Sequence, residues 1–280
     1  MTAHPKVTLV TCKSMPNLFK GEEGLLDELA ARGCDPQIKV WNDPDVDWSE
    51  AGMVVVRSVS DYASDRPAFL EWTKQLRRVQ NSADVLNWNT DKHYLKELAA
   101  LGMPTIPTNW LEPEQNLSKH QIHTRFPAFG EFVVKPAVSS GVRDIGRYTT
   151  VDTRQRQAAM RQVQGLLGEG RSVMIQRYVE EIDLHGEISL VFFNGLVSHA
   201  VEKRSALHPA SVSDPAVHEA VVTAEAADSV AWKWGEEIRR VLHGYVRSRL
   251  GHDEQFLFNR VDLVPDGKGS FLVMEVSLVD

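Results

Sequence analysis

The alternation of short apolar runs with helical segments in the first 86 residues restricts the possible folds more than any other feature of this sequence. Strand–helix–strand alternation produces parallel strands that are joined by short crossovers. Gly33, at the end of the first helical segment, is a typical C-terminal cap. We therefore predict a small parallel α/β lobe at residues 1–86. Its expected strands are 6–12, 36–41 and 53–58, and its expected helices are 22–33 and 65–80.

Polar side chains stand where one of these expected strands ends. Arg57 and Ser58 close the third strand, and Asp61 follows shortly after. Ligands of open parallel sheets bind outside the carboxyl ends of the strands. From this position alone, we expect Arg57, Ser58 and Asp61 to contact a substrate.

The middle of the chain, residues 87–180, mixes helices and strands in a different order. Thr90 or Asp91 is expected to cap a helix that runs to Gly102, because both residue types favour helix N-caps. The segment 103–118 is rich in Pro and Asn and is expected to be a connection. We predict an α+β lobe here. Its further elements are strands 131–136, 145–150 and 172–180, the small-residue loop 137–141 and helix 153–168.

The last part of the chain, residues 181–280, is rich in strands and is predicted to be a second α+β lobe. Asn194-Gly195 is a strong signal for a two-residue hairpin turn, and Asp266-Gly267 is interpreted in the same way. The polar stretch 204–228 is predicted to be a mobile surface loop. The expected strands are 186–193, 196–203, 256–263 and 271–279, and the expected helix is 229–249.

Charge and composition argue against several classes of protein. A net charge of −7 disfavours a dedicated nucleic-acid binder, whose affinity comes from a basic surface. Cys12 and Cys34 form no CxxC pair, so they are interpreted as packed thiols. The first residues lack the apolar h-region of a signal peptide, so we expect none, and no apolar run approaches the roughly 20 residues that span a bilayer. We expect a cytoplasmic homodimer that binds neither nucleic acid nor membrane.

The common nucleotide-binding motifs are absent, since there is no GxxxxGK[ST] and no GxGxxG after the first strand. Lys135 instead ends an apolar strand, and Ser139, Ser140 and Gly141 follow it. A lysine fixed by a sheet, next to a small loop that offers N–H groups, can bind phosphate. Taken alone, an ordinary strand-end lysine beside a turn explains this pattern better.

The segment 176–181 leaves the middle lobe and enters the last one. Its backbone groups can face an adenine edge, and a carboxylate at its end can reach ribose hydroxyls. A plain linker between lobes is the better interpretation of this segment in isolation. The candidate ATP contacts in it are Gln176, Tyr178, Val179 and Glu181.

A pair of carboxylates lies on the last two expected strands. Asp262 and Glu275 can lie side by side on one face of a hairpin, where two facing carboxylates favour cations. Mg²⁺ prefers hard oxygen ligands together with substrate phosphates. Arg260 points to the same face and can stabilise a phosphoryl group or an oxyanion. The alternative, exposed surface charges, fits poorly because the flanking residues are strongly apolar.

As an ordered set, these elements resemble the ATP-grasp superfamily. The motifs that carry the resemblance are DKHYL (91–95), VVKP (133–136), QRYVEE (176–181), GEISLVFFNGLVSHAVEKR (186–204) and the pair RVDL–MEVS (260–263, 274–277). The resemblance implies an ATP-grasp fold of three lobes, in which two α+β lobes enclose ATP. It also implies an ATP-dependent ligase that joins a carboxylate to an amine through an acyl phosphate.

The resemblance further implies roles for individual residues. Lys92, Lys135 and Glu187 belong to the ATP site, and the loop at 139–141 closes over the phosphates. Asp262 and Glu275 bind Mg²⁺, while Arg260 and Lys203 act in catalysis. The family usually has Asn at the third metal position, where this chain has Ser277. This departure leaves one or two Mg²⁺ ions possible.

A finer resemblance is to glutathione-synthetase-like ligases, to ribosomal-protein glutamate ligases and to the D-cycloserine-forming cyclo-ligases that close O-ureido-D-serine on itself. It is carried by DPDVDW (43–48), VVVRS with Asp61-Tyr62, and LNWNTDK (86–92). It implies a small amino-acid-like substrate and a role in antibiotic biosynthesis. His199 and Arg204 are further candidate substrate contacts. An intermolecular or peptide-tail ligase, and a non-catalytic ATP-binding regulator, are the alternatives.

Overall fold

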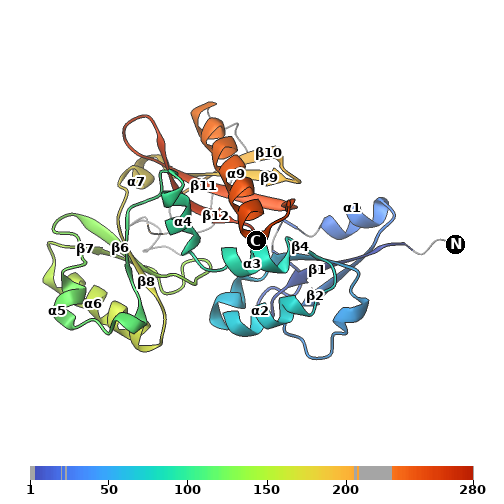
Figure 1. Ribbon diagram of the computed structural model, residues 1–280, viewed down its shortest axis with the longest axis horizontal. Coiled ribbons are helices and arrows are strands. Elements are labelled where there is room, and N and C mark those ends of the chain that lie inside the picture. Colours follow the sequence, from blue (N-terminus) through green and yellow to red (C-terminus); the bar gives the residue numbers. More distant parts are fainter. Residues whose placement is uncertain (1–3, 20, 23, 205–206, 208–228, 280) are drawn as a thin grey trace.

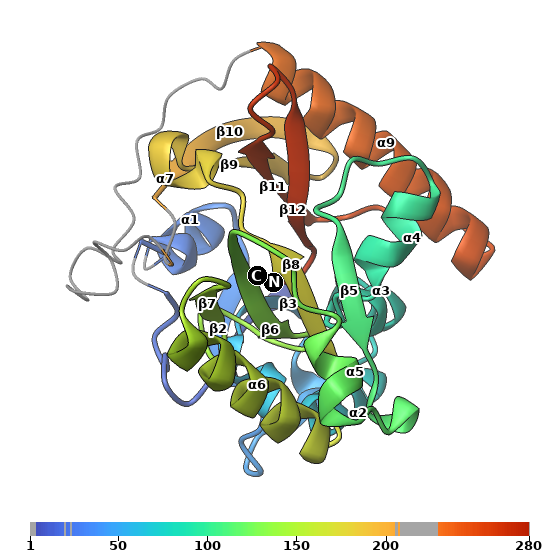
Figure 2. The same cartoon turned by 90° about the vertical axis from the view of Figure 1, so that its left-hand side faces the viewer.

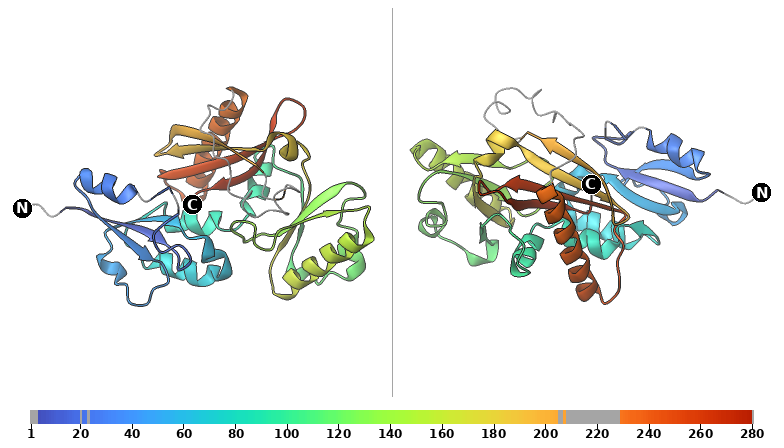
Figure 3. Two further views of the ribbon diagram at one scale, coloured as in Figure 1. Left: turned by 180° about the vertical axis from the view of Figure 1, so that it is seen from behind. Right: turned by 90° about the horizontal axis from the view of Figure 1, so that it is seen from above.

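The computed structural model describes residues 4–19, 21–22, 24–204, 207 and 229–279. The chain forms three four-stranded sheets, which we call sheets A, B and C (Figure 1). Sheet A belongs to the N-terminal lobe. Sheet C forms the middle lobe at the opposite end of the molecule, and sheet B lies above the gap between them (Figures 1 and 3).

Sheet A is entirely parallel, with strand order β2-β1-β3-β4, so the predicted α/β lobe is confirmed. The predicted helix 65–80 ends earlier, because the chain turns after Lys74 and adds a short fourth strand. The Asp65 side chain caps that helix by accepting from the Ala68 N–H at 3.1 Å. The elements are β1 (Lys6–Thr11), α1 (Leu25–Ala31), β2 (Asp35–Val40), β3 (Met53–Ser58), α2 (Arg66–Lys74) and β4 (Val79–Gln80), with 3₁₀ turns η1 (Trp48–Glu50) and η2 (Ser60–Ser64).

The helix predicted to run to Gly102 is two helices, α3 (Ala83–Asn89) and α4 (Tyr94–Ala100). Neither Thr90 nor Asp91 is an N-cap. Ser82 caps α3 instead, and the Asp91 side chain accepts from the His93 N–H at 3.1 Å. The helix breaks at Lys92, whose N–H donates to the Ala137 carbonyl at 2.9 Å and so binds a distant loop.

Sheet C is antiparallel, with strand order β5-β8-β6-β7, and helices α5 and α6 cover one of its faces (Figure 2). The segment 103–118 is not merely a connection, because it contains β5. The strand predicted to reach residue 180 ends at Arg177, and a short helix follows. The elements are β5 (Thr108–Leu111), η3 (Pro113–Gln115), α5 (Lys119–His123), β6 (Glu131–Pro136), β7 (Gly146–Thr149), α6 (Thr153–Gly168), β8 (Val173–Arg177) and α7 (Glu181–His185).

Sheet B is antiparallel, with strand order β10-β9-β11-β12, and the long helix α9 lies along one face (Figure 3). Asn194 and Gly195 form the predicted two-residue turn, with φ of 52° and 75°. The turn predicted at Asp266-Gly267 is longer: the chain returns only after Ser270, whose carbonyl accepts from the Asp266 N–H at 3.0 Å. The elements are β9 (Glu187–Phe193), β10 (Leu196–Lys203), α9 (Ser229–Leu250), β11 (Phe258–Pro265) and β12 (Phe271–Ser277).

The largest apolar core joins sheet B to α9 and also to α3 and α4. Residues 85–103 therefore pack with the last lobe, although they come before sheet C in the sequence. The lobe boundaries and the homodimer stay predictions. Most of the predicted loop 204–228 lies outside the described residues. Within the described part of the chain, no helix combines the length and the apolar character that crossing a membrane requires.

Candidate active site

A cavity of about 320 Å³ contains most of the residues that the sequence singled out in the middle and last lobes. It extends from sheet C to the face of sheet B that points away from α9. The segments that line it are far apart in the sequence, so the fold has assembled the site. The predicted residues that line it are Lys92, Lys135, Ser139, Ser140, Gly141, Gln176, Tyr178, Val179, Glu187, Lys203, Arg204, Arg260, Asp262, Glu275 and Ser277.

Asp262 and Glu275 are direct register partners on β11 and β12, as the hairpin pattern predicted. A β-bulge follows at once, because Asp262 pairs with Glu275 whereas Leu263 pairs with Val273. Met274 is thus the extra residue, and a bulge of this kind re-aims neighbouring side chains. As a result, Met274 and Glu275 both line the cavity although they are adjacent in sequence.

The Asp262 carboxylate is buried and is held by basic neighbours. Arg260 Nε donates to both of its oxygens, at 3.0 and 3.1 Å, and Lys203 Nζ lies 3.8 Å away. Burial alone would raise the pKa of Asp262, but the charges of Arg260 and Lys203 lower it below its usual value. Asp262 is therefore an anion whose charge is already partly balanced.

Glu187, at the start of β9, is the third acid of the cavity. Its carboxylate lies 3.7 Å from Lys203 Nζ. Burial, and then the nearby charge of Asp262, raise the pKa of Glu187 to about 7. Glu187 therefore takes up a proton more readily than an exposed glutamate, chiefly because it is buried.

Two lysines enter the cavity from different segments of the chain. Lys92 Nζ lies 3.8 Å from Glu275 and donates to the Ser139 carbonyl at 2.9 Å. Lys135 is buried at the end of β6. Burial and the neighbouring charge of Lys92 lower the pKa of Lys135 to about 8. Two buried cations side by side favour an anion such as a phosphate.

The loop after Lys135 lies against both lysine-bearing segments. Ser139 is buried, and its carbonyl binds Lys92. Gly141 has a φ of 63°, a left-handed conformation that glycine adopts without strain. The loop thus lies beside both lysines, and its role as a cover over phosphates stays a prediction.

The end of the cavity near sheet C is apolar. Ile106, Val133, Ile145, Ile182 and Met274 line it beside Tyr178 and Val179. The Tyr178 ring is stacked under the Arg147 guanidinium, whose central carbon lies 3.6 Å from the ring centroid. Gln176 is buried and donates to Thr108 Oγ1 at 2.8 Å. An apolar slot with a few polar groups suits a flat heteroaromatic ring.

The carboxylate pair fits Mg²⁺ bound chiefly through a substrate. Among the described residues, no group of three or more His, Cys, Asp or Glu side chains is arranged to hold a metal ion. Two carboxylates are nevertheless what Mg²⁺ commonly takes from a protein when phosphates and waters supply the other ligands. Ser277 lines the cavity next to them and can add a hydroxyl.

Several predicted contacts lie outside this cavity. Glu181 does not line it; its carboxylate lies 3.4 Å from His185 Nε2 and faces Gly267. His199 is exposed on β10 and lies 2.9 Å from Ser198 Oγ. The pairing of β9 and β10 is regular from His199 to Lys203, so His199 shares the strand face of Lys203, but it lies four residues nearer the hairpin turn and does not line the cavity.

The three predicted substrate contacts of the N-terminal lobe do not line the cavity, and other side chains engage them. Arg57 Nε donates to the Glu22 carboxylate at 2.9 Å, and Ser58 Oγ donates to the same carboxylate at 3.0 Å. Asp61 accepts from Trp41 Nε1 at 2.7 Å. The sequence position of these residues gave no sign of these distant partners.

The N-terminal lobe contributes Tyr62 instead, the residue next to Asp61. Tyr62 is buried, lines the cavity, and its hydroxyl lies 3.4 Å from the Ser139 carbonyl. Asn89 lines the cavity from the end of α3. Sequence reasoning noted the Asp61-Tyr62 pair but chose Asp61 for its position after the strand; both residues lie in the 3₁₀ turn η2, and Tyr62 is the one that lines the cavity.

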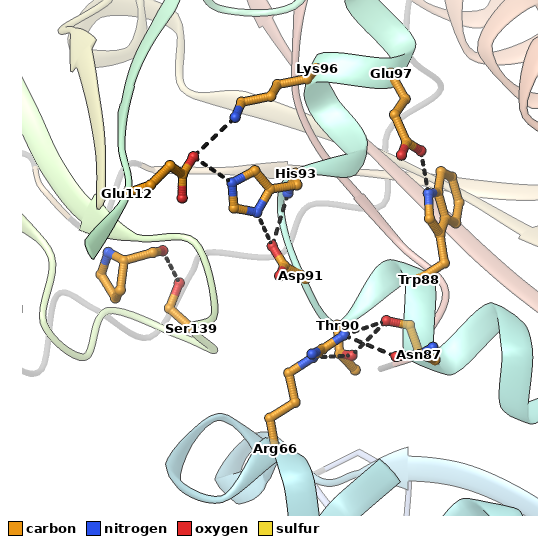
Figure 4. Close-up of polar contacts among 11 residues, drawn as sticks. Arg66, Asn87, Trp88, Thr90, Asp91, His93, Lys96, Glu97, Glu112 and Ser139 are labelled. Atoms are coloured by element: carbon orange, nitrogen blue, oxygen red, sulfur yellow. Dashed lines mark hydrogen bonds and ion pairs between the residues drawn. The ribbon is translucent and has the colours of Figure 1, made fainter. Parts of the chain in front are cut away.

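A polar network flanks Lys92 and reaches sheet C (Figure 4). His93 Nδ1 lies 2.6 Å from Asp91 and its Nε2 lies 3.1 Å from Glu112, which also accepts from Lys96 at 3.1 Å. The His93 ring stacks on Trp110 at 4.5 Å. The hydrogen bond to Asp91 raises the pKa of His93 above its usual value, against burial and with help from Glu112.

A larger cavity, of about 710 Å³, lies on the other side of the loop at residues 137–141. Its basic side chains are already paired: Arg66 with Thr90, Arg143 with Ser64, and Arg171 with Asp144. The carboxylate pair and Lys135 do not line it. The smaller cavity is therefore the candidate active site despite its size.

Comparison with known proteins agrees with this geometry. Residues 7–87 match the family described as D-cycloserine synthetase DcsG, N-terminal domain. The chain is 33% identical over 264 residues to the cycloserine biosynthesis protein DcsG of Streptomyces lavendulae, covering 91% of this chain and 85% of that protein. Its fold matches the crystal structure of D-cycloserine synthetase DcsG with a TM-score of 0.82 and 30% identity, over 98% of this chain and 91% of the other.

More distant structures share the fold. D-alanine–D-alanine ligase from Bacillus anthracis, complexed with ATP, matches with a TM-score of 0.61 at 14% identity, over 98% of this chain and 86% of that one. A RimK-domain ATP-grasp protein from Sphaerobacter thermophilus matches with a TM-score of 0.64 at 17% identity, over 98% and 92% of the two chains. The predicted three-lobe ATP-grasp fold is confirmed.

Proposed function

This chain belongs to the D-cycloserine synthetase DcsG family of ATP-grasp ligases, which form C–N bonds, and we propose that it closes a small amino-acid derivative into a ring at the expense of ATP. The substrate that we propose is O-ureido-D-serine, and the product is D-cycloserine. The observation that carries the proposal is the single cavity in which two buried lysines face a carboxylate pair and Arg260.

We propose that the substrate carboxylate attacks the γ-phosphorus of ATP, so that an acyl phosphate forms and ADP leaves. Lys92 and Lys135 hold the phosphate oxygens and offset the charge that develops on them. Asp262 and Glu275 would hold Mg²⁺, with Ser277 beside them. When bound there, the ion neutralises phosphate charge and holds the phosphates in line with the attacking oxygen. The apolar slot beside Tyr178 and Val179 receives the adenine ring.

In the second step, a nitrogen of the same molecule attacks the activated carbonyl carbon. The new C–N bond forms, the carbonyl–phosphate bond breaks, inorganic phosphate leaves, and the nitrogen releases its proton to solvent. Water then hydrolyses the bond between this nitrogen and its carbamoyl group, which leaves as CO2 and ammonia, so that the closed ring becomes D-cycloserine. Arg260, held by Asp262 at 3.0 Å, lies on the cavity face where its guanidinium can stabilise the tetrahedral oxyanion. Tyr62 and the loop at Ser139 exclude water, which would hydrolyse the acyl phosphate.

The experiment is a substrate panel with two readouts, ADP release and product mass. The purified protein is incubated with ATP, Mg²⁺ and O-ureido-D-serine, with its L-isomer, or with glutamate plus an amine donor. We expect ADP and D-cycloserine in equal amounts from the D-isomer. ADP release only with a carboxylate and a separate amine would replace cyclisation by an intermolecular ligase. ATP binding without ADP release from any acid would contradict the proposal.

A further inference from the structure

The outer edge of β12 has no neighbouring strand in sheet B, yet its peptide groups are satisfied by the segment at residues 81–104. The Val273 N–H donates to the Pro104 carbonyl at 2.8 Å, and the Val276 N–H donates to Tyr94 Oη at 3.0 Å. Helices α3 and α4, which carry most of this segment, lie beside β12 in two views (Figures 1 and 2). The segment thus takes the place of a missing edge strand.

Asn89 forms the central part of this substitute edge. Its Nδ2 donates to the Val276 carbonyl at 2.8 Å, and its Oδ1 accepts from the Leu278 N–H at 2.7 Å. An adjacent strand would bind the same two groups in the same way. Asn81 continues the pattern by donating to the Leu278 carbonyl at 2.6 Å. Both side chains are buried, so an apolar substitute would leave the groups that they bind without hydrogen-bond partners.

The peptides that Asn89 holds lie on either side of Ser277 and directly after Glu275. Side chains alternate along a strand, so fixing the peptides at 276 and 278 fixes the direction of the Glu275 and Ser277 side chains. The bulge at Met274 makes this support necessary, since a bulged strand lacks part of its ladder at that point. Leucine at position 89 would fill the same space but leave both peptide groups unpaired.

The same segment carries Lys92, three residues after Asn89, and Lys92 Nζ lies 3.8 Å from Glu275. Asn89 also lines the cavity itself. We propose that Asn89 is a positioning residue of the metal–phosphate site: it fixes Glu275 and Ser277 against Lys92, so that the two carboxylates and this lysine act as one preformed unit. This inference rests on the proposed function, because it assigns Mg²⁺ to Asp262 and Glu275.

The test measures metal binding directly. Mn²⁺ replaces Mg²⁺, and free Mn²⁺ is followed by electron paramagnetic resonance in the presence of protein and AMP-PNP. The variants are Asn89→Leu and the nearly isosteric Tyr94→Phe, with Glu275→Gln as reference. Asn259→Leu is the matched control, because Asn259 is buried on β11 and its amide has no hydrogen-bond partner among the described residues. Melting temperatures show which variants fold.

We expect Asn89→Leu to weaken Mn²⁺ binding about 10- to 100-fold, the usual effect of removing a group that orients a ligand. Tyr94→Phe should weaken Mn²⁺ binding several-fold, and Asn259→Leu should bind like the wild type.

Wild-type affinity in a folded Asn89→Leu protein, with Glu275→Gln impaired, would overturn the inference but leave the proposed function intact. If Asn89→Leu does not fold, wild-type affinity in Tyr94→Phe overturns it. An equal loss in Asn259→Leu would also overturn it, since any disturbed sheet would then suffice. Wild-type affinity in Glu275→Gln would overturn both claims.

Discussion

Asp262 and Glu275 face each other across β11 and β12, and each carboxylate approaches a lysine from a different part of the chain: Lys203 Nζ lies 3.8 Å from Asp262, and Lys92 Nζ lies 3.8 Å from Glu275. Each carboxylate thus has its own lysine neighbour, although the two acidic residues are adjacent in register. A cation between them and anionic phosphates on the lysines would complete the alternation of charge.

Removing one carboxylate tests this arrangement. Glu275→Gln keeps the size of the side chain but removes the charge that would hold Mg²⁺, so we expect kcat to fall about 100-fold or more, in the range typical of a lost electrostatic stabiliser. The rate of ADP release at steady state measures kcat. Glu202→Gln, an exposed acid on β10, is the control and should leave kcat unchanged. Full turnover in Glu275→Gln would show that the metal lies elsewhere.

The buried charge of Lys135 should lower the stability of the nucleotide-free protein. Its folded-state pKa of about 8 lies below the unfolded value of about 10.4, so the unfolded chain binds more protons between these values and stability rises with pH there. Lys135→Met removes the buried charge. We expect it to raise the melting temperature of the nucleotide-free protein at pH 7, with a smaller gain at pH 10, and to raise KM for ATP. A lower melting temperature at pH 7 would contradict this account.

His93 should make stability depend on pH in the opposite direction. Asp91 and Glu112 raise its folded-state pKa above the unfolded value of about 6.5, so the stabilisation is fully present below that value and is lost as pH rises through the folded pKa. The difference in unfolding free energy between wild type and His93→Gln should therefore shrink between pH 5.5 and pH 8.5. Denaturant titration measures it, and exposed His120→Gln is the control. A difference that grows with pH would refute the assignment.

Arg57 should stabilise the N-terminal lobe without taking part in catalysis. It pairs with the largely buried Glu22, and its guanidinium lies 5.0 Å from the Phe258 ring centroid. Arg57→Met leaves Glu22 without its partner, so we expect a loss of about 1–3 kcal/mol in unfolding free energy. Adding Glu22→Gln to the Arg57→Met variant should recover part of the lost unfolding free energy. KM for the amino-acid substrate should stay within about twofold of the wild type; a large rise would restore Arg57 as a substrate contact.

The sequence predicted those parts of the fold that follow from local periodicity. Strand β3 at 53–58, strand β10 at 196–203 and helix α6 at 153–168 lie where their patterns indicated. The facing of Asp262 and Glu275 also follows from alternation within one hairpin. The bulge at Met274 does not, because it depends on how β12 pairs with β11.

Contacts between distant segments were beyond sequence reasoning. The strand-end position of Arg57 and Asp61 gave no sign that Glu22 and Trp41 engage their side chains, or that Tyr62 lines the cavity. The break in the helix before Tyr94 arises because the Lys92 N–H binds the Ala137 carbonyl. None of these contacts can be recognised from the residues around it in the sequence.

The central claim is that ATP activates the substrate carboxylate, and oxygen transfer tests it most directly. O-ureido-D-serine carrying ¹⁸O in both carboxylate oxygens is turned over with unlabelled ATP, and the inorganic phosphate is examined by mass spectrometry or ³¹P NMR. An acyl phosphate requires that one ¹⁸O atom pass from the carboxylate to phosphate in each turnover, and we predict singly labelled phosphate equal in amount to ADP. Unlabelled phosphate alongside full ADP release and product formation would contradict the account.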